Sequence, residues 1–254
     1  MENLEKIIEK IENFAPPELA CDWDNSGWQI YLGNNSVNKI LVTLTCTLDV
    51  VEQAIKNNCD LIISHHPLIF EKLNKISTAN INSLALIKAI QSNIQVYSAH
   101  TNLDSAQGGI ADKLAELLEL KNVDCLEQIS EESKLGRVGE LKEEISLDIF
   151  IKKLKEALKT NNIKLINPLN KTKIKKIAVI PGSGAGFIHQ IKDIDVLITG
   201  DVKYHNALEV KDIVVIDAGH FETERIILPV IKELLKEFSM GVLIAEEKAP
   251  WEFL

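Results

Sequence analysis

The sequence predicts an α/β protein in two halves, with a mostly parallel sheet and helical crossovers. The first observation is that short aliphatic and β-branched runs alternate with amphipathic stretches along almost all of its 254 residues. That alternation is typical of parallel strands joined by helical crossovers. The second is that one polar stretch, residues 121–135, separates two such series. The length allows one large domain or two small ones.

The first series begins with a helix over residues 2–14, whose aliphatic residues recur on one face and which the following proline pair ends. The WDNSG cluster at 23–27 predicts a turn. The other elements expected in this series are strands over 28–32, 39–44, 61–64 and 95–98, and helices over 50–56, 80–92 and 109–119.

The second series follows the polar stretch, which we interpret as a link. Ser146 is placed to cap a helix that runs to about residue 159. The other elements expected here are strands over 136–141, 176–180, 196–199, 213–216 and 242–245, and helices over 185–191, 203–210 and 222–238. We therefore expect two α/β halves, 1–125 and 126–254.

Composition excludes several classes of protein. The 46% hydrophobic fraction excludes intrinsic disorder. A membrane span is not expected, because the sequence contains no run of about 18 apolar residues. The first 14 residues alternate charged and aliphatic side chains, which does not fit a secretory signal. A net charge of −9 argues against a general nucleic-acid binder. The four cysteines form no CxxC pair, so we expect buried free thiols and a cytoplasmic location.

Histidines gather at the carboxyl ends of the expected strands, the edge where α/β sheets bind ligands. In DLIISHHPLIF (60–70) a buried strand ends at His65 and His66, and Pro67 stops the ladder. Adjacent residues on an extended strand point in different directions, which suits two neighbouring ions better than one. The alternative is a pair of satisfied polar residues at a loop.

Two further clusters repeat this placement. In YSAHTNLD (97–104) a strand is followed by His100 and then by Asp104, for which capping the helix near Gly109 is the alternative role. In VVIDAGHFETER (214–225) His220 opens a helix and Glu224 follows one turn later on the same face. The alternative there is a helix-start histidine with a solvated glutamate.

Together the clusters offer nitrogen and oxygen ligands without thiolate, which suits zinc, manganese, iron, cobalt or nickel. Five or six ligands exceed what one tetrahedral zinc needs, whereas two ions a few ångströms apart would use them all. In TGDVKYHNAL (199–208), Asp201 and His205 can orient ligands or bound water, or else serve as a cap and a surface histidine. The sequence assigns no catalytic residue.

The PGSGAG run at 181–186 follows a strand and opens a helix, so it is either a phosphate cradle or a plain turn. It matches neither a P-loop nor GxGxxG. His189 lies in the helix that follows, as a surface or core residue.

These motifs in this order resemble the NGG-interacting-factor-three-like proteins, often labelled GTP cyclohydrolase type 2 homologs. The segments that carry the resemblance are WDNSG, DLIISHHPLIF, SAHTNLD, GGIADKLAELL, GRVGEL, PGSGAGF, TGDVKYHNAL, DAGHFETE and PWEFL. The resemblance implies a short-form member with two similar α/β lobes, 1–125 and 126–254, and without the extra inserted domain of longer members. It also implies a dinuclear metal centre between the lobes and a ring-shaped homohexamer. Its metal ligands would be His65, His66, Asp104, His220 and Glu224, with His100 supporting them.

One position departs from the family pattern. Many members have an Asp in a segment like LDAT, where this chain has LTCT with Thr45 in that place. If that Asp positions substrate or water, the substitution bears directly on activity.

Two functions from different classes follow. The first is a metal-dependent hydrolase acting on a nucleotide or another phosphate-bearing small molecule, because paired cations make hydroxide available near neutral pH. The second is a non-catalytic metal carrier or a ring-shaped scaffold. A DNA-encircling ring is a weaker third idea, against which the net charge counts.

Overall fold

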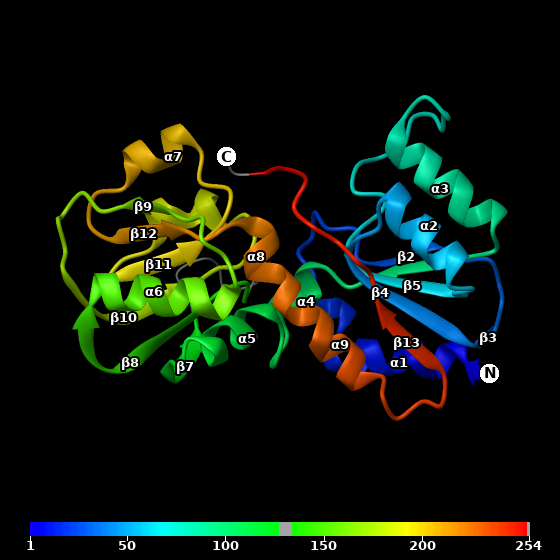
Figure 1. The fold of residues 1–254 in the computed structure, drawn as a ribbon, viewed down its shortest axis with the longest axis horizontal. Helices are drawn as coiled ribbons and strands as arrows, with labels where there is room; N and C mark the ends of the chain where they lie inside the picture. Colours follow the sequence, from blue (N-terminus) through cyan, green and yellow to red (C-terminus); the bar gives the residue numbers. More distant parts are fainter. Residues whose placement is uncertain (127–133, 253–254) are drawn as a thin grey trace. The chain divides into compact units, whose positions relative to one another are not determined.

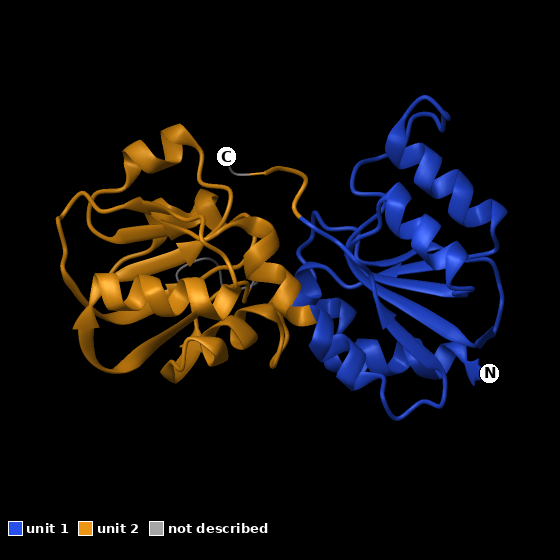
Figure 2. Ribbon diagram, viewed as in Figure 1, with its two compact units in different colours: residues 1–103, 228–248 blue, residues 104–227, 249–254 orange. Residues whose placement is uncertain are grey.

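The computed structural model describes residues 1–126 and 134–252. They divide into two compact units, each an α/β arrangement (Figure 2). Unit 1 comprises residues 1–103 and 228–248, and unit 2 comprises residues 104–227 and 249–254. The expected α/β class and two-lobe organisation are therefore found.

Unit 1 is built on a five-stranded sheet of order β13-β4-β5-β6-β2. All neighbours are parallel except β6 and β2. The strands of this sheet are β2 (Gly27–Ile30), β4 (Lys39–Thr45), β5 (Leu61–His66), β6 (Gln95–Ser98) and β13 (Gly241–Ile244). A separate antiparallel pair consists of β1 (Glu2–Asn3) and β3 (Ser36–Val37). The helices of unit 1 are α1 (Leu4–Phe14), η1 (Pro17–Leu19), α2 (Leu48–Lys56), α3 (Ile81–Gln91) and α9 (Leu228–Leu234).

Helices cover both faces of this sheet, α2 and α3 on one and α1 and α9 on the other (Figure 1). β4 and β5 read as continuous hydrophobic runs, as strands buried on both faces do. α1 buries Leu4, Ile7, Ile8 and Ile11, the face that the sequence predicts. The parallel register brings the carboxyl ends of β4, β5 and β6 to one edge.

Unit 2 has a six-stranded sheet of order β7-β8-β10-β11-β12-β9. Only β10, β11 and β12 are mutually parallel, so this sheet is mixed. Its strands are β7 (Lys121–Cys125), β8 (Arg137–Ser146), β9 (Lys164–Ile166), β10 (Lys173–Val179), β11 (Val196–Thr199) and β12 (Val214–Asp217). Its helices are α5 (Ile110–Leu117), α6 (Leu147–Leu158), η2 (Gly184–Gln190), α7 (Tyr204–Glu209), α8 (His220–Glu224) and η3 (Arg225–Ile227).

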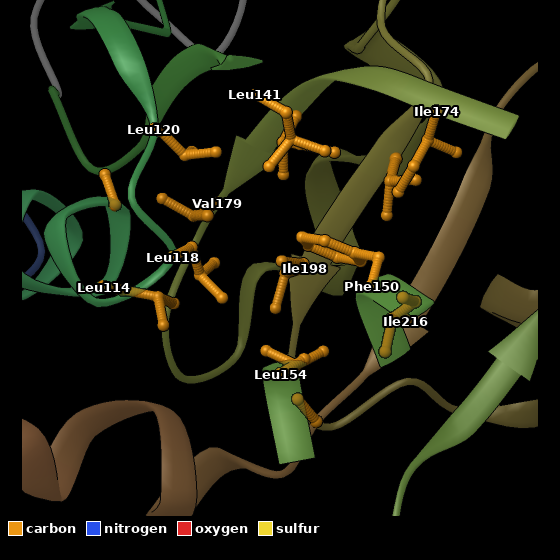
Figure 3. Close-up of a cluster of buried hydrophobic side chains, with 14 of the residues drawn as sticks. Leu114, Leu118, Leu120, Leu141, Phe150, Leu154, Ile174, Val179, Ile198 and Ile216 are labelled. Atoms are coloured by element: carbon orange, nitrogen blue, oxygen red, sulfur yellow. The ribbon is translucent and has the colours of Figure 1, made fainter. Parts of the chain in front are cut away.

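Alternating side chains of these strands form two cores. Ile177, Val179, Val196 and Ile198 pack with α5 and α6 around the fully buried Phe150 (Figure 3). The intervening residues, among them Ala178, Ile180, Leu197 and Val215, face the opposite side and pack against η2. The period of two along each strand fixes which residues face each of the two cores.

Several expectations at the element level are corrected. The helix expected over 222–238 is three short pieces, because Pro229 lacks an N–H and its ring clashes with the preceding turn. The start of the expected link, 121–125, is β7, paired with β8; residues 127–133 of that link lie outside the described part. The helix expected over 185–191 is the 3-10 helix η2.

The division between units also differs from the expected boundary at 125/126. β13, near the end of the chain, pairs parallel with β4, so the chain returns to unit 1 after completing unit 2. Hydrophobic patterning marks 241–244 as a strand but carries no information on its partner.

Two further expectations can be compared with the structure. The four cysteines form no disulfide within the described residues; Cys46 and Cys59 are buried and Cys21 and Cys125 are half-buried. Among the described helices, none has both the length and the apolar character that crossing a bilayer requires.

Candidate metal centre

Unit 1 brings three histidines together at the carboxyl edge of its sheet. His65 and His66 end β5, and His100 follows β6, the parallel neighbour of β5. One ring nitrogen from each lies within 4.8 Å of the others, and His65 is fully buried. We call these residues the histidine set of unit 1.

The adjacent rings of His65 and His66 lie closer than an ideal strand would allow. Their centroids are 4.8 Å apart. The strand ends here, where the Ser64 hydroxyl donates to the His66 carbonyl at 2.9 Å and Pro67 cannot continue the ladder. His65 and His66 are therefore able to donate to one ion, which strand alternation alone does not predict.

Each histidine of this set has its Nδ1 engaged by a protein group. His65 Nδ1 donates to the Ala99 carbonyl at 3.0 Å, and His100 Nδ1 donates to Asp24 Oδ1 at 2.7 Å. His66 Nδ1 lies 2.8 Å from Thr45 Oγ1. Holding Nδ1 in this way fixes the orientation of each imidazole ring, an arrangement typical of metal-binding histidines.

Asp24, from the WDNSG turn, is the carboxylate that orients His100. It also accepts hydrogen bonds from the Ser26 hydroxyl at 2.7 Å and from the Thr101 hydroxyl at 2.6 Å. Burial alone would raise the pKa of Asp24, but the hydrogen bonds from His100, Thr101 and Ser26 hold it far below its usual range. The sequence reasoning missed Asp24, although the turn motif that contains it was the available signal.

Thr45, the departure from the family pattern, lies directly beside His66. Cross-strand register pairs the two residues, and the Thr45 hydroxyl takes the Nδ1 position that a carboxylate takes at His100. The backbone N–H groups of Leu44 and Thr45 donate to the Glu247 carboxylate at 2.8 and 3.0 Å. His66 is thus oriented by a neutral partner, whereas His100 is oriented by a charged one.

Unit 2 builds its own donor group at the equivalent edge. α8 begins at His220, whose Nδ1 lies 2.7 Å from Asp201 Oδ2 and whose Nε2 lies 2.9 Å from Glu224 Oε2. Burial lowers the pKa of His220, but the hydrogen bonds and negative charges of Glu224 and Asp201 outweigh it and raise the pKa to about 9. We call Asp201, His220 and Glu224 the triad of unit 2.

Glycines make room for this triad. Gly182 has φ +64°, and a Cβ there would lie 1.9 Å from Glu224 Oε1. A Cβ on Gly200 would lie 2.6 Å from the backbone nitrogen of His220. These positions exclude any side chain because the loops after β10 and β11 pack directly on α8.

Two backbone amides of the PGSGAG run have acceptors within the protein. The Gly182 N–H donates to the Thr223 hydroxyl at 3.0 Å, and the Gly184 N–H donates to the Thr199 hydroxyl at 2.9 Å. Both donors are used within the protein. The run packs against the triad, which favours the interpretation as a strand-to-helix turn over a phosphate cradle.

The remaining residues singled out from the sequence lie in three different helices. Asp104 lies in α4 (Thr101–Ser105), and the N-cap of α5 is Gly109, so Asp104 does not cap that helix. His205 is exposed on α7 with its ring against Tyr204, and it belongs to none of the donor groups found in the described residues. His189 is exposed on η2.

The donor chemistry of both units fits a divalent metal. Imidazole nitrogens with fixed tautomers and a buried carboxylate are ligands for transition metals. The model of the family described as Duf34/NIF3 (NGG1p interacting factor 3) matches residues 2–250 of this chain. The chain belongs to the Duf34/NIF3 family.

Three relatives illustrate the range of this family. "GTP cyclohydrolase 1 type 2 homolog" of Clostridium acetobutylicum is 40% identical over 84% of this chain and 82% of that protein. "NGG1-interacting factor 3" of Saccharomyces cerevisiae is 34% identical over 96% of this chain and 94% of that protein. The crystal structure of a Bacillus cereus protein related to NIF3 has a TM-score of 0.87 at 24% identity, covering 100% of this chain and 99% of the other, which establishes the shared fold.

Proposed function

We propose that this Duf34/NIF3 protein holds two divalent metal ions and uses them to hydrolyse a nucleotide or another phosphate-bearing small molecule. The metal ligands in this proposal are His65, His66, Asp104, His220 and Glu224. The observation that carries it is that a protein group engages Nδ1 of His65, of His66 and of His220, which fixes the orientation of each imidazole ring.

The number of donors supports two ions rather than one. A single tetrahedral site needs four ligands, and the five proposed residues include two carboxylates, the side chains able to bridge cations. Asp104 and Glu224 contribute a charge of −2 against +4, so about +2 remains to attract an anionic substrate. When bound, such a pair of ions polarises substrate oxygens and lowers the pKa of water towards neutrality.

The protein groups around the donors have separate roles. Asp24 holds the His100 ring, and Asp201 holds the His220 ring, by charge-assisted hydrogen bonds of 2.7 Å. The raised pKa of His220 means that a metal ion must displace a proton from the Glu224 pair before it binds. The names of curated relatives make GTP the first substrate to test.

Metal analysis and turnover test the proposal together. We expect two ions per chain in the parent, one or none in Asp104→Asn, and two in His189→Ala, whose side chain is exposed on η2. The amide of Asp104→Asn keeps the shape but is a neutral and weaker ligand. Two tightly held ions in Asp104→Asn, or their loss in His189→Ala, would contradict the ligand assignment.

Turnover separates the hydrolase from the carrier or scaffold. Metal-loaded parent is assayed on a panel of nucleotides and phosphoesters that begins with GTP, beside chelator-treated parent. We expect hydrolysis of at least one class, dependent on metal. Two bound ions without turnover across the panel would favour the non-catalytic alternative.

We also propose a homohexamer, on the basis of the family resemblance. Light scattering at micromolar concentration should give a mass near six times 28.4 kDa. A monomer would contradict it.

A further inference from the structure

Unit 2 contains a cavity of about 470 Å³ that adjoins the triad but contains side chains with no role in holding metal. Its walls include His220 and Asp201, together with Asn161, Asn162, Glu222 and Trp251. The volume is in the range of small-molecule sites. Because His220 lines it, a molecule bound there lies beside one of the proposed metal ligands.

Trp251 provides a flat apolar wall. Its side chain is 48% exposed, although tryptophan usually buries most of its surface. An exposed indole in a cavity is a stacking surface for a planar ring. The neighbouring Asn161 and Asn162 are exposed and carry amide groups that both donate and accept hydrogen bonds.

The charges of this cavity decide which planar ring fits. The only ammonium among its lining residues is that of Lys164, which lies 2.7 Å from the Asp217 carboxylate and is neutralised by it. Asp201 is paired with His220 at 2.7 Å, which leaves the Glu222 carboxylate as the surplus negative charge of the lining. An anionic phosphate is repelled there, whereas ring N–H groups can donate to the carboxylates.

The backbone turn at Gly219 determines where the Glu222 carboxylate lies. Gly219 has φ +90°, and a Cβ on it would lie 2.1 Å from Glu222 Oε2. Asp217 Oδ1 accepts the Gly219 N–H at 3.1 Å and so fixes this turn. The missing side chain leaves the space in which the Glu222 carboxylate lies across the cavity wall.

We infer that this cavity binds a nitrogen heterocycle, stacked on Trp251 with its ring N–H groups directed to Glu222, and that it excludes phosphate. The inference rests on the proposed function, because it names the part of a nucleotide substrate that unit 2 would recognise. The binding itself requires no metal.

Calorimetric titration of guanosine into chelator-treated protein tests the cavity alone. Guanosine is the probe because its ring edge presents adjacent N–H donors to a carboxylate. We expect guanosine to bind, inosine, which lacks the exocyclic amino group, to bind more weakly, and inorganic pyrophosphate not to compete.

Variants locate the binding. Trp251→Ala should weaken guanosine binding about 10-fold, while Trp251→Phe keeps most of the affinity by retaining a stacking ring. Glu222→Gln should weaken guanosine more than inosine. Tyr204→Ala is the matched control, since Tyr204 is an exposed aromatic residue of unit 2 that does not line the cavity.

Failure of the cavity and failure of the proposed function are distinguishable. Unchanged guanosine affinity in Trp251→Ala, no binding of guanosine, or competition by pyrophosphate in metal-free protein would each overturn the inference, whatever the metal analysis gives. A different outcome is guanosine binding that depends on Trp251 in a protein that binds no metal or hydrolyses no substrate. That outcome would support the cavity as a heterocycle site and contradict the hydrolase proposal.

Discussion

Gly182 shows how a residue without a side chain determines the position of a metal ligand. Its Cα lies against the Glu224 carboxylate, and its positive φ suits glycine far better than any other residue. Glu224 is almost fully buried, so it has little freedom to move away. The PGSG turn is therefore part of the triad's structure even though it contributes no ligand.

Gly182→Ala is expected to displace Glu224 and destabilise unit 2. The new Cβ meets Oε1, and strain at positive φ adds about 1–3 kcal/mol. Thermal unfolding and elemental analysis should show a lower Tm and loss of bound metal. Gly186→Ala is the control, because a Cβ there meets nothing within 4 Å. Equal metal content in both variants would contradict this account.

His220 predicts a pH dependence of stability in the metal-free protein. Its pKa is raised to about 9 from an ordinary value of 6.5, so the folded state binds the extra proton more tightly than the unfolded state. The stabilisation is fully present below pH 6.5 and is lost as the pH rises through 9, by up to about 3 kcal/mol. Urea unfolding of chelated protein between pH 6.5 and 9.5 measures it, and His220→Gln should flatten that decline.

Among the elements, the segment after β13 fixes the end of β4. β13 pairs with β4 after a sequence separation of about two hundred residues, and Glu247 then accepts the N–H groups of Leu44 and Thr45. Since Thr45 contacts His66, this anchor also supports the histidine set of unit 1. The final strand is thus part of the framework of the site.

Glu247→Ala is expected to lower the free energy of unfolding by about 1–3 kcal/mol, because two N–H groups at the end of β4 lose a charged acceptor. Hydrogen exchange at Leu44 and Thr45 should accelerate. Glu246→Ala is the control, since the backbone of Glu246, not its side chain, bonds to Gln53. Equal exchange rates in the two variants would show that the anchor is unimportant.

For the whole molecule, metal binding should couple to stability. Ions that bind only the folded state add about 2.7 kcal/mol at a hundredfold excess over the dissociation constant. For a chain of this size that corresponds to roughly 5–10 °C in Tm. Scanning calorimetry before and after chelation, with metal restored, checks it. An unchanged Tm together with no metal by elemental analysis would contradict the metal centre.

The sequence by itself determined the α/β class, the buried strands and the candidate donors, because these follow from local periodicity and from residue type at strand ends. β4, β5, β6, β10, β11 and β12 all lie where the hydrophobic runs predict them. The motifs also carried the family resemblance, which the match over residues 2–250 confirms.

Only the tertiary structure decided which group orients each donor. Asp24 lies 76 positions from His100, Thr45 lies 21 from His66 and Asp201 lies 19 from His220, and no local pattern links these pairs. The return of β13 to β4 and the role of the PGSG turn were likewise decided by strand pairing and close packing. Such contacts depend on which surfaces meet after folding, and a linear pattern of residues does not encode them locally.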